Sequence, residues 1–368
     1  MITITNSYNT AIVYTDQLDS GAEGLLRALC GSPLSKDSRI RIMPDVHAGK
    51  GCAVGTTMTV RDRVAPGLVG ADIGCGMEVF KVSGKRLELQ KLDKLVREKV
   101  PSGRAIRTVP HRFAERVALD KLCCARHIQK DKAQCSIGTL GGGNHFIEVD
   151  RGEDGSLWLV IHSGSRHLGT EAAVWYQNAA FRQCPEGTPY ELAWAEGSLL
   201  EDYLHDMKII TAFAALNRQA IADEIIRGMK LDVLDSFSTV HNYIDTDAMI
   251  LRKGAVSAQK GERLIIPLNM RDGALICLGK GNDEWNSSAP HGAGRRLSRA
   301  EARQSFTLSQ YKKEMGKVFS TSVSRETLDE CPMAYKPPEE ILAQTEPTVE
   351  VVERITPIYN FKAGEVRR

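Results

Sequence analysis

The sequence lacks the features that mark exported or membrane-embedded proteins. Its first residues, 1–19, have no basic start followed by an apolar core, so they do not resemble a secretory signal peptide. No run approaches the roughly 20 apolar residues that a membrane helix needs. We therefore expect a cytoplasmic protein that does not associate with a membrane.

An excess of charge of one sign is also missing. Lys and Arg number 48 against 46 for Asp and Glu, so the formal net charge is only +2. No global positive field marks a nucleic-acid binder, and any contact with a polyanion must come from a local cluster of basic side chains. The composition neither supports nor excludes RNA.

Long linkers, internal repeats and low-complexity segments are absent from the sequence as well. The 368 residues are 42% hydrophobic and 26% charged, which is typical of soluble globular proteins large enough to bury a sizeable core. Strand-like and helix-like segments alternate along the chain. We predict an α+β fold in a single domain over residues 1–368, with a mixed β-sheet core flanked by helices.

Periodicity places several of these elements. Leucines near a period of 3.6 predict a helix over residues 87–100, and a longer apolar stripe predicts one over residues 198–230. Ser198 and Glu201 are expected to form a capping box at the start of the longer helix. Strands are expected within residues 39–80 and at 145–149, 157–162, 263–268 and 274–278, with a helix opening near Leu297.

Some potential metal ligands are interpreted as ordinary structural residues. The nine cysteines include the adjacent pair Cys123 and Cys124, and a thiol outside a motif is expected to be a buried, reduced core residue. His205 and Asp206 lie on the predicted 198–230 helix. Because nothing typical of a metal site surrounds them in the sequence, a solvated or core-satisfied pair is expected there.

Histidines are concentrated in a particular kind of loop. Five of the nine close a glycine-rich turn or follow a predicted strand: His47, His145, His162, His241 and His291. Glycines let the backbone pass close to a ligand, so such loops suit metals and phosphates. In another glycine-rich loop, Asp72 and Cys75 add a carboxylate and a thiol three residues apart.

Imidazole, thiolate and carboxylate together are ligands that borderline divalent metals accept. The thiolate of Cys75 has lone pairs to bridge two ions, which allows a binuclear site. The alternative is that Asp72 caps a turn and Cys75 packs in the core. Taken with the separated histidines, the metal site is the better interpretation, although the sequence does not show that these segments meet in space.

A run of arginines follows the glycine-rich segment 291–294 and is expected at the start of a helix: Arg295, Arg296, Arg299 and Arg303. Arginine side chains beside a helix N-terminus can form a phosphate site. A solvated helix face is the alternative. Because Arg295 and Arg299 are expected on one side of the helix, next to His291, we favour phosphate binding.

As a set, these motifs resemble the RtcB family of RNA ligases. The matching segments occur in family order across nearly the whole chain: MPDVHAGKG (43–51), VGADIGCGM (69–77), GTLGGGNHFIEV (138–149), HSGSRHLG (162–169), VHNY (240–243), HGAGRRLSR (291–299) and AYK (334–336). Any one of them would be weak, whereas seven together are highly specific. The resemblance implies a GTP- and manganese-dependent ligase with an RtcB-like fold.

The resemblance also implies roles for individual residues. Two manganese ions would be held by Asp72, Cys75, His145, His162 and His241, with Cys75 bridging them. His291 would be the nucleophile that attacks GTP and holds GMP through a phosphoramidate bond. Phosphates would be held by Asn144, Arg295 and Arg299, and the guanine edge would contact Glu148 and Lys362. Tyr335 would stack on the base, and the rest of the implied nucleotide site is Asn242, Gly292 and Gly294.

The implied reaction transfers GMP to an RNA 3′-phosphate, after which a 5′-hydroxyl displaces it; a 2′,3′-cyclic phosphate would first be hydrolysed. Guanylation supplies the leaving group that a 3′-phosphate lacks, and metal ions would neutralise the phosphates. The chain resembles a compact bacterial subgroup sometimes found beside a release-factor homologue. That subgroup implies repair of cleaved ribosomal or transfer RNA.

The sequence departs from the family pattern in one loop. Where the family usually has a Pro-Gly-Ser-Met-Gly-like loop, residues 267–273 are PLNMRDG, and Ala274 aligns with a serine expected to touch the nucleotide. Guanine selectivity, turnover or dependence on an activating partner could therefore differ. Two other functions are compatible with parts of the pattern: a metal-dependent phosphoesterase without a guanylated histidine, and a non-catalytic RNA-binding factor descended from the ligases.

Overall fold

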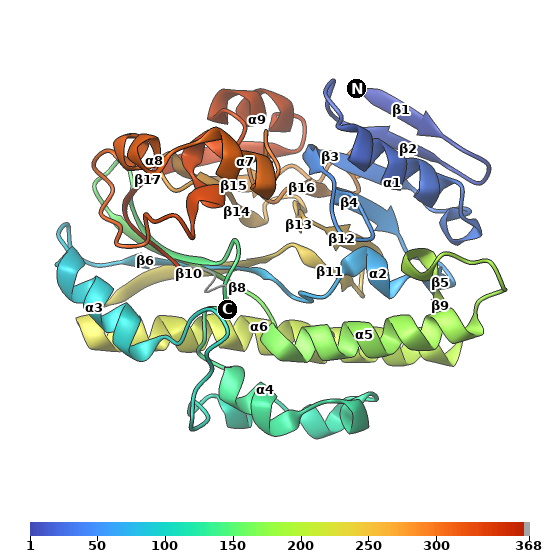
Figure 1. Ribbon diagram of the computed structural model, residues 1–368, viewed down its shortest axis with the longest axis horizontal. Coiled ribbons are helices and arrows are strands. Elements are labelled where there is room, and N and C mark those ends of the chain that lie inside the picture. Colours follow the sequence, from blue (N-terminus) through green and yellow to red (C-terminus); the bar gives the residue numbers. More distant parts are fainter. Residues whose placement is uncertain (364–368) are drawn as a thin grey trace.

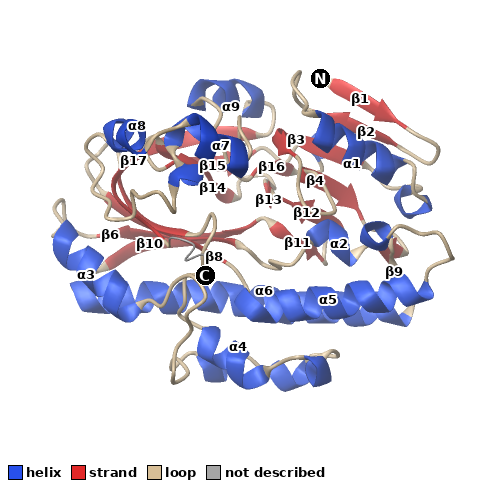
Figure 2. Ribbon diagram, in the orientation of Figure 1, coloured by secondary structure: helices blue, strands red, loops and turns tan. Residues whose placement is uncertain are grey.

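Two sheets contain most strands of residues 1–363, the part of the chain that this computed structural model describes (Figures 1 and 2). One sheet pairs β2 with β3 in parallel and its other neighbours antiparallel. Its order is β1 (Ile2–Thr5), β2 (Thr10–Val13), β3 (Ile40–His47), β4 (Val54–Thr59), β12 (Ile250–Lys253) and β11 (Asn242–Asp245).

The second sheet is antiparallel throughout. Its order is β10 (Val233–Val240), β6 (Gly76–Val82), β8 (Leu157–Ser163), β7 (Phe146–Arg151), β17 (Val349–Lys362), β15 (Gly273–Gly279) and β14 (Arg263–Asn269). Two short pairs complete the strands of the described residues: β13 (Ala255–Ser257) with β16 (Ser288–Pro290), and β5 (Arg63–Val64) with β9 (Ala195–Glu196).

Two long helices, α5 (Arg166–Gln183) and α6 (Ser198–Met229), lie side by side in the lower part of the view in Figure 1, and α6 runs beneath the second sheet. Helix α6 packs on β6 and β8, α3 (Leu89–Lys99) packs on α6, and α4 (Lys130–Ser136) packs on α5. The remaining α-helices of residues 1–363 are α1 (Ser20–Cys30), α2 (Pro66–Val69), α7 (Arg299–Ser305), α8 (Leu308–Met315) and α9 (Pro338–Thr345). The predicted α+β class, with a mixed core flanked by helices, is confirmed.

Strand β8 explains why a continuous apolar run forms a strand here. All seven of its residues are buried, because both faces of the sheet are covered. Leu159 and Ile161 face a core shared with α3 and α6, whereas Val160 and Trp158 pack with residues of β14, β15 and β17. One face of the sheet at β8 is therefore covered by helices, and the other face is covered by strands β14, β15 and β17 from the far end of the same sheet.

The starts of two helices differ in detail from the sequence prediction, one in its cap and the other in its position. The capping box expected from Ser198 and Glu201 is wrong: Gly197 is the N-cap, with φ 58°, and no side chain caps the helix. The helix containing the arginine run begins only at Arg299, capped by Ser298. Arg295 therefore lies in the preceding loop, and the prediction that Arg295 and Arg299 share one helix face is wrong.

A buried arginine ties α6 to the loop that precedes β6. Arg218 is fully buried and donates from Nη1 to the carbonyl oxygens of Gly74, at 2.9 Å, and Ser163, at 3.0 Å. Its Nε lies 3.5 Å from Oε2 of Glu78. These hydrogen bonds fix the 72–75 loop beside the end of β8.

None of the helices within residues 1–363 has the length and apolar character that a membrane span requires.

Candidate metal centre and nucleotide pocket

Neighbouring antiparallel strands bring distant residues to one edge of the second sheet. Antiparallel neighbours begin and end alternately at a given edge. At this edge β10 ends before His241, β6 begins after Cys75, β8 ends around His162, β7 begins after His145, and β17 ends at Lys362. The strand order β10-β6-β8-β7-β17 therefore places five of the predicted site residues in one row.

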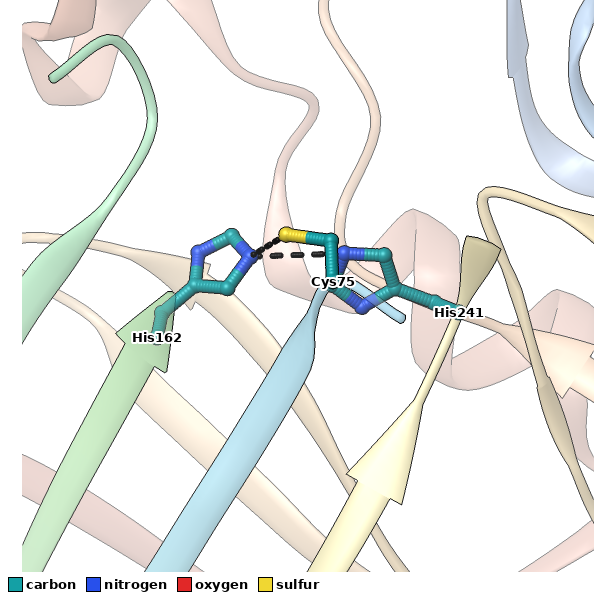
Figure 3. Close-up of side chains that lie close together, drawn as sticks. All are labelled: Cys75, His162 and His241. Carbon is teal, nitrogen blue, oxygen red and sulfur yellow. Dashed lines mark hydrogen bonds between the residues drawn. The ribbon is translucent and has the colours of Figure 1, made fainter. Parts of the chain in front are cut away.

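The five predicted metal ligands converge at this edge. Cys75 Sγ lies 3.3 Å from His162 Nε2 and 3.4 Å from His145 Nε2. His162 Nε2 lies 3.3 Å from His241 Nε2, and Asp72 Oδ2 lies 3.0 Å from His145 Nε2. Figure 3 shows Cys75 between the rings of His162 and His241.

The donor atoms form two groups that share one thiol. Cys75, His162 and His241 offer donor atoms within 4.8 Å of one another, and so do Asp72, Cys75 and His145. A shared sulfur between two triads is an arrangement that can hold two divalent ions through a bridging thiolate. The donor set therefore fits a binuclear metal centre.

Backbone carbonyls orient two of the imidazoles. His145 Nδ1 lies 2.8 Å from the Leu140 carbonyl oxygen, and His162 Nδ1 lies 3.1 Å from that of Asn144. Bonds of this kind place the proton on Nδ1 and turn the Nε2 lone pair toward the cluster, as in metal sites where an outer partner fixes the tautomer. His241 Nδ1 is buried and, within residues 1–363, has no hydrogen-bond partner.

The electrostatics also suit metal binding. Burial, together with neighbouring positive groups, lowers the pKa of His162 and His241 well below the usual value, so both rings are neutral. Burial raises the pKa of Asp72, but the neighbouring His145 and Cys75 side chains outweigh it and leave that pKa below its ordinary value. Burial and the Asp72 charge raise the pKa of Cys75, so a bound metal would have to displace the thiol proton.

The predicted nucleophile, His291, lies beside the metal ligands. It follows β16, and its ring centroid is 5.0 Å from that of His241. His291 Nδ1 lies 2.7 Å from Oδ2 of Asp45, and its backbone N–H donates to the same oxygen at 3.2 Å. Asp45 is fully buried. With Nδ1 held by the carboxylate, Nε2 is the ring nitrogen left to react.

Sequence analysis missed Asp45. The residue lies inside the motif segment 43–51, so the motif was a signal, but its partner His291 is 246 residues away. A carboxylate that holds Nδ1 of a reactive histidine fixes the tautomer and stabilises positive charge on the ring. Asp45 is therefore a candidate positioning residue.

One cavity contains His291, His162 and most of the predicted nucleotide contacts. The predicted residues that line it are Asn144, Glu148, Gly292, Gly294, Arg295, Arg299, Tyr335 and Lys362. Asn242 is not among the cavity-lining residues of the described chain; its side-chain oxygen instead accepts from the Gly254 N–H at 3.0 Å. His47, Phe146 and Asn360 line the cavity without having been predicted to contact a nucleotide.

Comparison with known proteins shows the family. The family model described as "tRNA-splicing ligase RtcB" matches residues 34–125 and 111–363. The chain belongs to the RtcB family. The resemblance predicted from the seven motifs is thereby confirmed.

Individual RtcB proteins are similar over most of their length. The RNA-splicing ligase RtcB of Escherichia coli strain K12 and RtcB1 of E. coli strain ATCC 25922 are each 30% identical to this chain over 356 residues, which covers 85% of this chain and 87% of each relative. RtcB2 of strain ATCC 25922 is 28% identical over 336 residues, covering 83% of this chain and 82% of that protein.

In this member of the RtcB family, one buried carboxylate connects the basic residues of the cavity. Glu330 is 2% exposed, and its oxygens contact Lys362 Nζ at 2.5 Å, the hydroxyl of Tyr335 at 2.7 Å and Nη1 of Arg295 at 3.4 Å. Arg299 also pairs with Glu330 and with Oδ2 of Asp329, at 2.7 Å.

The charges around Glu330 determine its ionisation. Burial raises the pKa of this carboxyl, but Lys362, Arg299 and Arg295 outweigh burial and lower the pKa to about 2. The two arginines predicted to hold phosphates are therefore already paired with carboxylates. Glu330 precedes the AYK motif and has no pattern that predicts this position, so sequence analysis missed it.

Glu148 faces β17 across the sheet. In the register of β7 and β17, Glu148 lies opposite Asn360, whose Nδ2 donates to Oε2 of Glu148 at 2.5 Å, and Phe146 lies opposite Lys362. Lys362 Nζ also sits 5.5 Å from the centroid of the Phe146 ring. Burial raises the pKa of Glu148 to about 7, against the opposing influence of Asn360 and Lys362.

The loop that departs from the RtcB pattern forms one wall of the cavity. It is the turn between β14 and β15, and its cavity-lining residues are Pro267, Leu268, Asn269, Met270 and Gly273. Side chains tie the turn together: Asn269 Nδ2 donates to Asp272 at 2.7 Å, and Arg271 Nε donates to Asp272 at 2.9 Å. Ala274 is buried in the core and does not line the cavity within the described chain.

Proposed function

We propose that this chain is an RNA ligase that joins a 3′-phosphate end to a 5′-hydroxyl end through GMP carried on His291. The observation that carries the proposal is the position of His291. Its Nδ1 is held by Asp45, its ring neighbours His241 of the metal centre, and it lines the same cavity as Glu148 and Lys362. Membership of the RtcB family supports the same activity.

The first step is a transfer of GMP to the protein. His291 Nε2 attacks the α-phosphorus of GTP, forming a nitrogen–phosphorus bond while the bond to the leaving pyrophosphate breaks. Asp45 accepts the Nδ1–H hydrogen bond and stabilises the positive charge that develops on the imidazole. Two bound manganese ions, held by Asp72, Cys75 and the three ligand histidines, would supply neutralisation of phosphate charge.

Two further displacements complete the reaction. An oxygen of the RNA 3′-phosphate attacks the phosphorus of GMP, and the bond to His291 breaks, which leaves an RNA end activated by GMP. The 5′-hydroxyl then attacks the phosphorus of the former 3′-phosphate, a phosphodiester forms and GMP leaves with the electron pair. A 2′,3′-cyclic phosphate end is first hydrolysed to the 3′-phosphate.

The cavity offers complementary groups for guanine and phosphate. We assign base recognition to Glu148, which can accept from the N–H groups of guanine, and to Lys362, which can donate to its carbonyl oxygen. Tyr335 stacks on the base. Phosphate and ribose contacts come from Asn144, Gly292, Gly294, Arg295 and Arg299.

The biological setting is part of the proposal. We place the reaction in the cytoplasm, in repair of cleaved transfer or ribosomal RNA, with a single domain acting alone or beside a release-factor homologue. The arrangement favours ligation over simple phosphate removal, because phosphoester hydrolysis needs the metal ions but not a histidine held by Asp45.

A joining assay tests this function. RNA with a 3′-phosphate and a 5′-hydroxyl is incubated with the protein, GTP and manganese, and the product length is measured. We expect a joined product with the wild type and with His167→Ala, which changes a histidine outside the cavity, and none with His291→Ala. Release of inorganic phosphate without joining, or joining by the His291→Ala variant, would overturn the proposal.

A further inference from the structure

The segment before α4 has little regular structure. It contains three short 3₁₀ helices, η2 (Ala114–Arg116), η3 (Leu119–Lys121) and η4 (Ala125–His127). The turns of this segment are closed by short-range backbone hydrogen bonds, so its position on the molecule depends on contacts with neighbouring elements. Two neighbouring residues of α6 hold it: Asp206, and His205, whose Nε2 lies 3.0 Å from the Lys121 carbonyl oxygen.

Asp206 holds the two adjacent cysteines through their backbone. Its Oδ1 accepts the N–H of Cys123 at 2.8 Å, and its Oδ2 accepts the N–H of Cys124 at 3.0 Å and the hydroxyl of Tyr176 at 2.6 Å. Cys124 is buried and Cys123 is exposed. The carboxylate therefore fixes the position of the Cys123 thiol beside α6.

The cluster around Cys123 combines metal-ligand atoms of different chemical types. Cys123, His205 and Asp206 each offer one ligand atom, and the three atoms lie within 4.8 Å of one another. Asp202, one helical turn before Asp206 on the same face of α6, lies beside the Cys123 thiol as a hydrogen-bond partner. One thiol, one imidazole and two carboxylates are thus gathered from two segments.

The imidazole and carboxylate have the free lone pairs that a ligand needs. His205 Nε2 lies 3.0 Å from the Lys121 carbonyl oxygen, so the proton sits on Nε2 and the lone pair on Nδ1. Asp206 Oδ1 accepts one backbone hydrogen bond, and the carboxylate also interacts with the Cys123 thiol, whose proton a bound metal would replace. The exposed side chains of Cys123 and His205 can rotate to close the remaining separation.

We propose that Cys123, His205 and Asp206, completed by Asp202, form a second metal site that binds Zn²⁺ or another thiophilic divalent cation. It shares no residue with the centre around Cys75. Four donors of these types match the tetrahedral coordination that zinc prefers. The bound ion would cross-link the irregular 114–128 segment to α6, so its role is structural rather than catalytic.

Binding at this site is coupled to loss of a proton. Burial, reinforced by the charges of Asp206 and Asp202, raises the pKa of Cys123 to about 11, so the free thiol is protonated at neutral pH. Formation of the sulfur–metal bond breaks the S–H bond and releases one proton to solvent. The solvated or core-satisfied pair expected from the sequence agrees with the structure, in which His205 is exposed and Asp206 is buried and hydrogen-bonded; the sequence did not indicate that Cys123 lies beside them.

Cobalt absorption tests the site without an activity readout. The titration uses the Cys75→Ala protein, in which the catalytic centre has lost its thiolate. We expect one equivalent of Co²⁺ to produce a thiolate-to-cobalt charge-transfer band, and the band to disappear when Cys123→Ser is added. The added change Cys135→Ser, at another partly exposed thiol, leaves the band unchanged. Absence of the band in Cys75→Ala, or its persistence in Cys75→Ala/Cys123→Ser, would overturn the proposal.

A second measurement starts from the wild-type chain, for which the result does not depend on the folding of a variant. Alkylation rates of Cys123 and Cys135 are followed by mass spectrometry with and without Zn²⁺. We expect zinc to slow alkylation of Cys123 at least about tenfold and to leave Cys135 unaffected. Substitution of His205 by Asn should lower zinc affinity at this site at least about tenfold, since even loss of an outer-shell partner costs a metal site about 10–100-fold. Equal protection of the two thiols would contradict the assignment.

Discussion

The hydrogen bond at Nδ1 of His291 determines that Nε2 is the reactive atom of the ring. Asp45 holds Nδ1 at 2.7 Å and is itself fully buried, so the ring has one orientation and one available tautomer. The carboxylate also provides the negative charge that a nitrogen–phosphorus bond on Nε2 would require nearby. The chemistry of the proposed nucleophile thus depends on a residue that does not line the cavity within the described chain.

Replacing that carboxylate tests its role. Asp45→Asn keeps the shape of the side chain but removes the charge and permits the wrong tautomer. We expect the single-turnover rate of GMP transfer to fall by about 10²–10⁴-fold, as for the matching change in a serine protease triad. GTP affinity, measured by equilibrium binding, should change by less than about threefold, since Asp45 does not line the cavity within the described residues. A normal transfer rate would exclude the positioning role.

We expect the carboxylate of Glu330 to be the negatively charged partner of the cavity's basic residues when no phosphate is bound. In Glu330→Gln the positive charges of Lys362 and Arg295 lose their shared partner, so the free energy of unfolding should fall by about 3–5 kcal/mol in urea titrations. Added GTP should raise the stability of the variant more than that of the wild type, because phosphates replace the missing anion. Glu340→Gln, which breaks a pair nearer the surface, should cost less than about 1 kcal/mol. A Glu330→Gln protein as stable as the wild type would contradict this role.

The raised pKa of Glu148 predicts a pH dependence of stability. Its pKa in the fold is about 7 against an ordinary value of 4.5, so the folded state binds the proton more tightly than the unfolded state. The contribution of protonated Glu148 to the free energy of unfolding is therefore complete below about pH 4.5 and is lost as the pH rises through 7. The loss is on the order of 3 kcal/mol.

Urea unfolding at several pH values measures this effect in wild type and Glu148→Gln. The variant cannot ionise, so the difference in stability between the two proteins should shift in favour of the variant as the pH rises from 5 to 8. A pH-independent difference would show that Glu148 titrates near its ordinary value.

Among the elements, the pairing of β6 with β10 determines the spacing of the metal ligands. Cys75 precedes β6, His241 follows β10, and the His241 N–H donates to the Cys75 carbonyl oxygen at 2.9 Å. Gly76, the first residue of β6, packs closely against β10. A Cβ built at Gly76 would stand 2.0 Å from the Thr239 carbonyl oxygen of that strand. Only glycine allows the two strands to approach this closely.

Gly76→Ala should therefore separate the strands and disturb both ligands at once. We expect manganese affinity, measured by calorimetry, to fall at least about tenfold, comparable to loss of an outer-shell partner. Gly24→Ala is the matched control, because a Cβ at this position in α1 meets nothing within 4 Å. That control should be neutral or stabilising by up to about 1 kcal/mol. Unchanged affinity in Gly76→Ala would show that the strand spacing is not a constraint.

The sequence predicted elements well where a local pattern determines them. The apolar run 157–162 predicted the strand β8, and the helical period predicted α6. The start of α6 at Ser198 was predicted correctly, but the capping box was wrong because Ser198 is the first residue of the helix and Gly197 takes the cap position. The predicted position of Arg295 was wrong because Ser298 is the N-cap of α7. The helix therefore begins at Arg299, and Arg295 lies in the loop before it.

For the whole molecule, the site depends on contacts that no local pattern encodes. The motifs named most of the site residues, and the family resemblance supplied their proposed roles. Asp45 pairs with His291 across 246 residues, and Lys362 pairs with Glu330 across 32. Strand order and register bring them together, and these follow from packing of the complete chain.

The central claim is that the folded chain presents one imidazole, that of His291, to GTP beside a metal centre. The direct test is incubation with manganese and GTP labelled at the α-phosphate, followed by digestion and mapping of the labelled peptide. The account predicts an acid-labile GMP adduct on His291 and none in a folded His291→Ala protein. Label on another residue, or undiminished label in His291→Ala, would contradict it.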